Sequence, residues 1–156
     1  MRITKDNIHK FIKHDITMDC DNYGITHIDY IPDNILYLQC LNNKLTELPE
    51  LPSKLIGLYC GVNKLTKLPN LPESLEYLYC YNNKLTEMPK LPESLVKLNC
   101  YGNNMSYTIT KDNITEHNQL LKRKEGELKL YYLNSRCSCS VHNKFFFFVF
   151  NAKSKS

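Results

Sequence analysis

A unit of 20 residues repeats along the middle of this chain, and it constrains the fold more than any other feature. The segment at 71–90, LPESLEYLYCYNNKLTEMPK, follows LPSKLIGLYCGVNKLTKLPN at 51–70 and precedes LPESLVKLNCYGNN, which begins at residue 91. An earlier copy, IPDNILYLQCLNNKLTELPE, begins at residue 31. A fixed period of this length predicts a repeat architecture, in which each copy folds as one unit and stacks on the next.

The order of residues inside each copy predicts a short strand, a turn and an extended return. Side chains alternate over residues 77–81, so Leu78 and Cys80 face one side of a strand and the intervening tyrosines face the other. The Asn-Asn pair that follows suits a turn. Two prolines three residues apart then exclude a helix in the return, because proline lacks a backbone N–H and favours extended neighbours. Each copy is therefore expected to form one coil.

Two polar columns recur with the same period and are expected to face the interior. A single coil cannot bury its apolar side chains alone, so neighbouring coils must stack and pair their strands. The cysteines are predicted to be small apolar fillers, and the buried asparagine amides are predicted to bond backbone groups of the turns. Cysteine recurs at Cys40, Cys60, Cys80 and Cys100, and asparagine recurs at Asn43, Asn63, Asn83 and Asn103.

The pattern L-x-x-L-x-C-x-x-N-x-L, which begins at Leu75 in the copy quoted first, resembles the leucine-rich repeat signature, with cysteine where that signature has leucine. The 20-residue length and the Leu-Pro-x-Leu-Pro return resemble the short repeats of bacterial effectors of the YopM and IpaH type. The cysteine form, with its YCYNNKLT wording, is most similar to leucine-rich repeat proteins of giant amoebal DNA viruses. The resemblance covers residues 16–105. It implies a leucine-rich repeat solenoid with a short parallel β-sheet on the concave face and an extended, polyproline-like convex side.

Three regions follow from the limits of the repeat. Residues 1–15 are expected to form an N-terminal helical cap, and residues 16–108 a solenoid of about five turns. Residues 109–156 are expected to form a C-terminal cap helix followed by an apolar tail. Helical caps at both ends would cover the open sides of the first and last coils. The first coil, residues 16–30, departs from the others and has Tyr23 in place of the asparagine.

Both caps contain the segment ITKDNI, at residues 3–8 and again at 109–114. A helix is expected over residues 3–14, and a second is expected over residues 112–125, ending near Gly126. The apolar side chains that face the solenoid are expected to be Ile8, Phe11 and Ile12 in the first helix and Ile114, Leu120 and Leu121 in the second.

The last part of the chain contains an apolar run, Phe145 to Phe150. This run is expected to form a buried strand or to pack against the C-terminal cap, and membrane insertion beside the flanking lysines is the alternative. It is much shorter than the roughly 18 apolar residues of a transmembrane helix, and no other segment reaches that length. We therefore predict no membrane span.

Composition argues against several classes of partner. The net charge is +4 and both signs are mixed along the repeats, so no basic stripe is available for nucleic acid. The first 15 residues carry charges throughout and lack the apolar core of a signal peptide. The protein is therefore expected to be intracellular, in the cytoplasm of a host cell. It is expected to bind neither nucleic acid nor a small-molecule substrate.

The sequence predicts no catalytic or metal site. The column cysteines have no neighbouring base, and a straight ladder of thiols cannot surround a tetrahedral zinc ion. Cys137, Cys139 and His142 could form a zinc- or redox-responsive element, but their spacing differs from a C-x2-C pair and a fourth ligand is missing. We therefore predict no catalytic residue, no metal and no cofactor, and that the protein is not an enzyme.

The outward-facing strand positions are the candidate binding site. If Leu78 and Cys80 point inward, the alternate positions line the concave face, and six of these are tyrosines. Tyrosine combines a large contact area with a hydrogen-bonding tip and is enriched in protein interfaces. The alternative is that these tyrosines only stabilise the sheet by packing in ladders. The candidate partner-binding residues are Tyr37, Tyr59, Tyr77, Tyr79, Tyr81 and Tyr101.

These features predict a non-enzymatic protein–protein interaction module with a protein partner, of the kind that a virus or a bacterial effector directs at its host. The resemblance to IpaH-type effectors implies a second hypothesis, a substrate-recognition adaptor for ubiquitin transfer. In that family the ligase activity lies in a separate C-terminal domain, and no segment after the repeats matches it. The adaptor would therefore lack a catalytic domain of its own.

Overall fold

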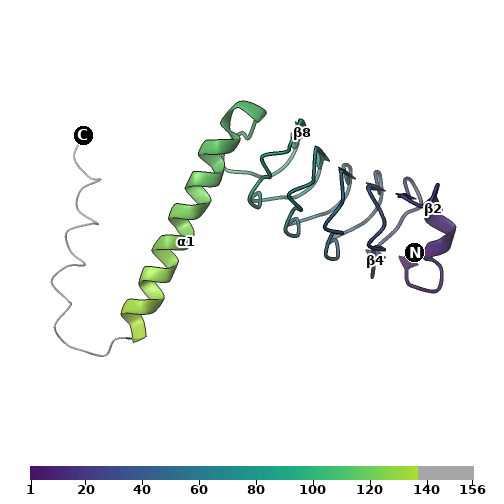
Figure 1. The fold of residues 1–156 in the computed structure, drawn as a ribbon, viewed down its shortest axis with the longest axis horizontal. Helices are drawn as coiled ribbons and strands as arrows, with labels where there is room; N and C mark the ends of the chain where they lie inside the picture. Colours follow the sequence, from purple (N-terminus) through teal and green to yellow (C-terminus); the bar gives the residue numbers. More distant parts are fainter. Residues whose placement is uncertain (137–156) are drawn as a thin grey trace. The chain divides into compact units, whose positions relative to one another are not determined.

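The computed structural model describes residues 1–136. The chain forms two compact units, residues 1–121 and residues 122–156. In the first unit, successive 20-residue segments wind as coils that lie side by side (Figure 1). The described part of the second unit is the remainder of a long helix, α1 (Ile114–Arg136), whose first turns belong to the first unit.

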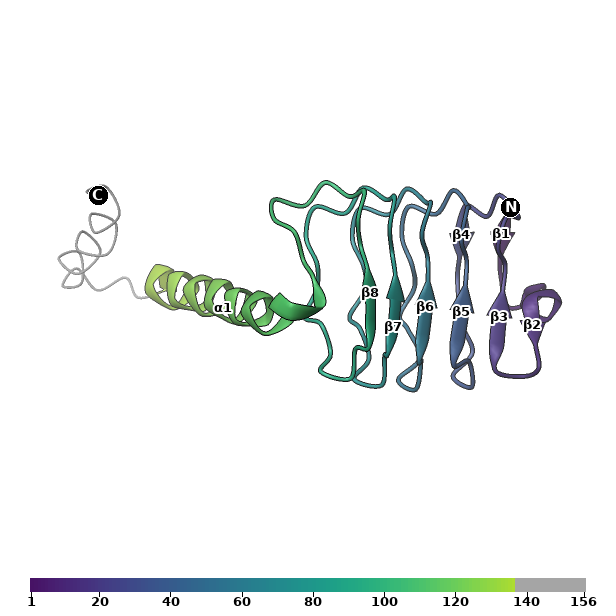
Figure 2. The ribbon, with the colours of Figure 1, turned by 90° about the horizontal axis from the view of Figure 1, so that it is seen from above.

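A six-stranded sheet runs along one side of the coils in the order β2-β3-β5-β6-β7-β8, and Figure 2 shows its strands next to one another. All of its pairings are parallel except the one between β2 and β3. The parallel strands start at 20-residue intervals, which confirms the predicted solenoid, although they mark about 4 turns where about five were expected. They are β3 (Thr17–Asp19), β5 (Tyr37–Gln39), β6 (Gly57–Tyr59), β7 (Tyr77–Tyr79) and β8 (Lys97–Asn99).

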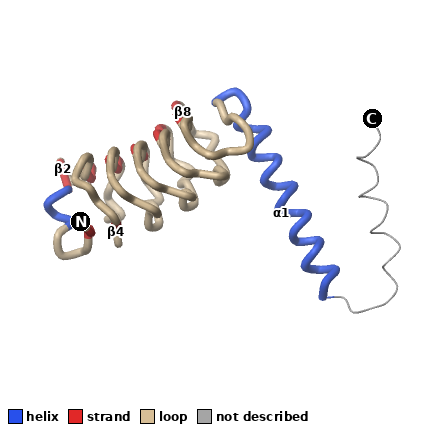
Figure 3. Tube along the Cα trace, turned by 180° about the vertical axis from the view of Figure 1, so that it is seen from behind, coloured by secondary structure: helices blue, strands red, loops and turns tan. Residues whose placement is uncertain are grey.

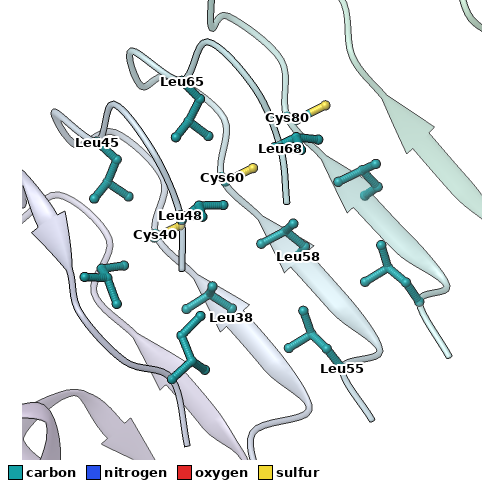
Figure 4. Close-up of a cluster of buried hydrophobic side chains, with 14 of the residues drawn as sticks. Leu38, Cys40, Leu45, Leu48, Leu55, Leu58, Cys60, Leu65, Leu68 and Cys80 are labelled. Carbon is teal, nitrogen blue, oxygen red and sulfur yellow. The ribbon is translucent and has the colours of Figure 1, made fainter. Parts of the chain in front are cut away.

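The predicted columns line up in register from coil to coil. Leu38 lies opposite Leu58, which in turn lies opposite Leu78. Leu78 and Cys80 are fully buried, as predicted from the alternation in the strand. Figure 4 shows the leucines and cysteines of successive coils pointing into the same interior. Each coil therefore shares its core with the coils on both sides.

The return segments contain no helix, as predicted from their prolines. Figure 3 shows that helix occurs only towards the two ends of the described chain, whereas the coils consist of short strands joined by loops. Between strand and return, the asparagine column connects neighbouring coils through its side-chain amides. In the described residues, no buried polar side-chain atom lacks a hydrogen-bond partner.

The turn after each strand places one residue in the left-handed backbone region. Asparagine or glycine usually occupies this region, because an L-residue with a branched side chain is crowded there. Four of the five equivalent positions follow this rule, and Val62 does not. The equivalent residues are Asn22 (φ 64°), Asn42 (φ 51°), Val62 (φ 55°), Asn82 (φ 51°) and Gly102 (φ 67°).

Val62→Asn is expected to raise the free energy of unfolding by about 1 kcal/mol, because asparagine tolerates the left-handed region better than a β-branched residue. An amide there could also continue the bond that Asn42 Nδ2 donates to Asn22 Oδ1 at 2.7 Å. Urea denaturation measures the change. Val96→Asn is the matched control, since Val96 is also exposed but has no positive φ. Equal effects of the two substitutions would show that Val62 is not strained.

The N-terminal cap differs from the prediction. The helix expected over residues 3–14 is reduced to one 3-10 turn, η1 (Ile8–Phe11), between two short strands. These are β1 (Arg2–Ile3), which pairs in parallel with β4 (His27–Ile28), and β2 (Ile12–Lys13), which pairs with β3. Unpaired backbone groups at the edge of the first coil thus override the local helical pattern. Ile8 and Phe11 are buried as expected, and the Phe11 ring meets the Tyr23 ring edge-on at 5.4 Å.

The two ITKDNI segments form the same local hydrogen bonds. Thr4 N–H donates to Asn7 Oδ1 at 2.9 Å, and Thr110 N–H donates to Asn113 Oδ1 at 2.8 Å. In each segment the asparagine amide also donates to the backbone oxygen two residues before the threonine. The hydrogen bonds are shared, but the helical turns differ: η1 begins at Ile8, at the end of the first segment, whereas η2 (Lys111–Asn113) lies inside the second segment and leads directly into α1.

The C-terminal helix is longer than predicted. It passes through Gly126, beside which a Cβ atom would meet open space, and continues to Arg136. Of the expected inward side chains, Ile114 packs against the core and Leu121 is half-buried, but Leu120 is 38% exposed. The prediction of Leu120 as an inward residue is wrong.

His117 and Asn118 attach the start of α1 to the last coils. His117 Nε2 donates to the Pro89 carbonyl at 3.0 Å, since that oxygen can only accept, and the other ring nitrogen meets the Tyr107 hydroxyl at 2.5 Å. Asn118 both accepts from Leu91 N–H at 2.9 Å and donates to the Leu91 carbonyl at 2.8 Å. The Asn118 amide thus bonds the backbone of Leu91 in the place where a further coil would otherwise lie.

Several sequence predictions fall outside the described residues. They concern the run from Phe145 to Phe150 and the possible zinc or redox group Cys137, Cys139 and His142. Within residues 1–136, no helix combines the length and the apolar character that a bilayer crossing requires.

Candidate functional site: a tyrosine face on the sheet

The six tyrosines predicted for partner binding share the outward side of the sheet. The inward residues of β5, β6 and β7 are buried, and the register places Tyr59 directly opposite Tyr79. Tyr101 is 64% exposed and the other five are half-buried. We name the surface formed by Tyr37, Tyr59, Tyr77, Tyr79, Tyr81 and Tyr101 the tyrosine face.

Aromatic stacking organises this face. The rings of Tyr59 and Tyr79 lie 5.3 Å apart at an interplanar angle of 17°. The rings of Tyr81 and Tyr101 lie 5.7 Å apart and are almost parallel, at 1°. Such pairs contribute about 0.5–1.5 kcal/mol beyond the area they bury. Ladder packing, the alternative given by the sequence, is therefore part of what these side chains do.

Two glycines provide the space that the rings occupy. A Cβ atom at Gly57 would lie 2.8 Å from ring carbons of both Tyr37 and Tyr59. At Gly61 it would lie 2.6 Å from a ring carbon of Tyr81. Any other residue at these positions would lift the rings from the sheet. The sequence shows both glycines in the outward columns, but the structure is needed to show that neighbouring rings rest on them.

The hydroxyl ends of four tyrosines are close enough to influence one another. Burial, and then the neighbouring phenols of Tyr79, Tyr37 and Tyr77, raise the pKa of Tyr59. With its pKa raised, the Tyr59 phenol stays protonated near pH 7, and a phenol hydroxyl can both donate and accept hydrogen bonds. The face offers apolar ring surface and hydroxyl groups together, the combination found at the centres of protein interfaces.

Two carboxylates continue the outward columns into the first coil. Asp19 lies opposite Gln39 in the register, and Asp21 Oδ1 accepts a bond from Leu41 N–H at 2.6 Å. Asp19 Oδ2 also binds Lys13 Nζ at 2.5 Å, and this lysine is exposed. Sequence reasoning missed these two residues, although extending the columns by one more period would have found them.

The electrostatics of the two carboxylates differ. Burial would raise the pKa of Asp19, but the bonds from Lys13 and from the Asp21 N–H lower it below its ordinary value. Burial raises the pKa of Asp21, and the negative charge of Asp19 adds to this effect, against the bond from Leu41. The acidic end of the face thus holds two carboxylates, one of which, Asp19, is paired with Lys13.

The column cysteines do not contribute reactive groups to this face. These four and Cys20, which has the equivalent position in the first coil, are all buried, and burial raises the pKa of Cys20 and Cys60 to about 12. A thiol with such a pKa is almost entirely protonated near neutral pH and is a poor nucleophile. Within residues 1–136, no three histidine, cysteine, aspartate or glutamate side chains gather in a way that could hold a metal ion.

Stacked coils, strands in parallel register and an asparagine at each turn define the class of protein. The chain is a leucine-rich repeat protein with repeats of 20 residues. Comparison with protein-family models and with curated proteins finds no match.

Solved structures of bacterial effectors are similar to this chain. YopM from Yersinia enterocolitica is 36% identical with a TM-score of 0.59, over 61% of this chain and 21% of that chain. A Shigella effector leucine-rich repeat domain is 37% identical with a TM-score of 0.58, over 60% of this chain and 43% of that one. YopM from Yersinia pestis is 36% identical with a TM-score of 0.51, over 58% and 26%.

This chain therefore matches less than half the length of each of these proteins. The similarity to effectors of the YopM type, expected from the sequence, is confirmed. The likeness to repeat proteins of giant amoebal viruses is not tested by these matches and stays a prediction.

Proposed function

We propose that this protein binds a protein partner of a host cell through the tyrosine face, as a viral or effector-type interaction protein acting in the host cytoplasm. A leucine-rich repeat solenoid similar to those of effectors supports the general role of a protein-interaction module. The observation that carries the more specific proposal is the tyrosine face itself, because six phenols share one side of the sheet and Tyr101 remains 64% exposed.

The arrangement of the rings suggests that the tyrosines bind a partner as well as pack against one another. Stacking against a neighbour and resting on glycine fix the ring positions before a partner arrives, so little side-chain entropy is lost on binding. The hydroxyl groups give such a surface specificity, since a partner must match them with hydrogen bonds.

The test compares partners retained by the wild-type protein and by the triple variant Tyr77→Ser, Tyr79→Ser and Tyr81→Ser in affinity purification from an amoebal host lysate. We expect the variant to lose about 100-fold in affinity for a face-dependent partner, since each of several aromatic anchors contributes 1 kcal/mol or more. Tyr30→Ser, outside the face, is the matched control. A circular dichroism melt verifies that each variant is folded.

A second variant separates binding from packing. Tyr79→Phe with Tyr81→Phe keeps the rings and removes two hydroxyls, so it should remain as stable as the wild type and still bind its partner less tightly. If the serine variant is folded and retains every partner at wild-type affinity, the proposed function is wrong. The ubiquitin-adaptor hypothesis stays a prediction, since no finding tests it.

A further inference from the structure

The tyrosine face has a charge gradient along the stack of coils. Following one row of the register, the outward residues are Asp19, Gln39, Tyr59, Tyr79 and Asn99. The row therefore begins with a carboxylate, crosses stacked aromatic rings and ends with a neutral amide.

The two neighbouring rows strengthen this polarity. Asp21 lies beside Asp19 at the first coil, and Lys97 occupies the outward position of β8 at the other end. A partner segment that carries one positive charge is thus favoured in a single direction along the face, with its cation over the first coil. Lys13, which pairs with Asp19, is exposed and can be displaced from this carboxylate without being buried.

The backbone of the sheet leaves little room for strand addition. β5, β6 and β7 are each paired on both sides, so their N–H and C=O groups are already bonded. A partner that lies over these strands must be recognised by side chains. A polyproline II segment suits this requirement, because it has no internal hydrogen bonds, is partly ordered before binding and docks on aromatic surfaces.

We propose that the tyrosine face binds a proline-rich segment in the polyproline II conformation, with an arginine of that segment over Asp19 and Asp21 and its prolines over Tyr59 and Tyr79. This inference rests on the proposed function and specifies the chemistry of the partner. Arginine suits the acidic end, because its planar guanidinium bonds carboxylates in pairs and also stacks on aromatic rings.

The register fixes the spacing of the ligand. Strands lie about 4.8 Å apart, so Asp19 is about 10 Å from the Tyr59 position and about 14 Å from the Tyr79 position. A polyproline II helix rises about 3.1 Å per residue. The arginine and the prolines that contact the rings should therefore be about three to five residues apart.

The experiment titrates the full chain with the peptide Arg-Ala-Ala-Pro-Pro-Pro-Pro-Pro-Pro and with its reverse, both acetylated and amidated. Binding is measured by calorimetry and by NMR of ¹³C-labelled tyrosine rings. We expect one of the two peptides to bind and to shift the ring signals of Tyr59 and Tyr79. A peptide with glutamine in place of arginine should bind about fivefold more weakly, the effect of one charge pair near a surface.

Matched variants locate the charge. Asp19→Asn with Asp21→Asn keeps the side-chain shape and an oxygen that can accept the Leu41 N–H bond, and it should remove the preference for arginine over glutamine. Glu47→Gln with Glu87→Gln removes two exposed carboxylates from the return segments and should leave the preference unchanged.

The outcomes separate this inference from the proposed function. Equal affinity for the arginine and glutamine peptides, or no binding of either peptide at millimolar concentration, would overturn the inference. If this happens while the serine variant of the face still loses its protein partners, the proposed function stands and only the chemistry of the ligand is wrong. Binding of the arginine peptide that persists in the serine variant would place the site elsewhere and also overturn the inference.

Discussion

Replacing Asn83 with alanine is expected to lower the free energy of unfolding by about 4 kcal/mol, because three buried backbone groups lose a hydrogen-bond partner. Its Oδ1 accepts from Leu65 N–H at 2.9 Å, and its Nδ2 lies within bonding distance of three carbonyls. These are Cys60 O at 3.0 Å, Cys80 O at 3.1 Å and Tyr81 O at 3.3 Å. Urea denaturation followed by circular dichroism measures the change.

Two further substitutions show that the bonds, and not the loss of volume, cause the effect. Asn83→Asp keeps an acceptor for Leu65 but cannot donate when ionised, so it should be at least as destabilising as alanine. Asn70→Ala, at an exposed asparagine in a return segment, should change stability by less than about 0.5 kcal/mol. An effect of Asn83→Ala as small as that of Asn70→Ala would contradict the structural role of the column.

Stability is expected to fall steeply above pH 9 because of the buried thiols. Burial raises the pKa of Cys60 to about 12, and raises the pKa of Cys40 and of Cys80 well above 9. In the unfolded chain these thiols ionise near pH 9, whereas in the folded chain they stay protonated. Their contribution is therefore complete below pH 9 and is lost as the pH rises towards the folded pKa. Three thiols together should remove about 4 kcal/mol per pH unit.

Urea denaturation at several pH values between 8 and 11 measures this slope. Cys60→Ala should flatten it by about 1.4 kcal/mol per pH unit, since one thiol no longer ionises on unfolding. Tyrosines such as Tyr59 also lose protons in this range, and comparison with the alanine variant removes their share. Identical slopes for the two proteins would mean that burial does not raise the pKa of the Cys60 thiol.

The repeat itself could be predicted from the sequence because every coil repeats the same local rules. Alternation placed Leu78 inside, proline excluded helix from the returns, and the period gave the parallel register of the strands. Because the local pattern agrees with the packing in each copy, few alternative folds are compatible with the sequence. The tyrosines of the candidate site followed from the same alternation, because outward positions are fixed once the inward ones are known.

The ends could not be predicted in this way, because they occur once and depend on distant partners. Residues 3–14 have a helical pattern, yet their two ends pair with the first coil as short strands, and only one 3-10 turn forms between them. At the other end, His117 and Asn118 hold α1 to the coils through backbone oxygens and an N–H that no sequence pattern marks. Gly126 weakens a helix by about 1 kcal/mol and does not end it.

Details of the site were hidden for a related reason. In the sequence, Gly57 and Gly61 interrupt the columns of larger side chains. Only the structure shows that neighbouring tyrosine rings pack against these glycines. Val62 reads as an ordinary exposed residue until its φ of 55° is known. Asp19 and Asp21 were missed because the first coil was treated as a degenerate copy.

The asparagine bonds all point the same way along the chain. Each amide joins its own turn to the coil before it, as Asn43 does by donating to Cys20 O at 2.8 Å and accepting from Ile25 N–H at 2.8 Å. The first coil is preceded by the cap and not by another coil, and Tyr23, whose ring meets that of Phe11 in the cap, occupies the asparagine position. The stack of coils is thus directional. A copy with asparagine can be added or lost anywhere after the first coil, and each such change alters the length of the sheet by about 4.8 Å. The copy with tyrosine can only be the first coil.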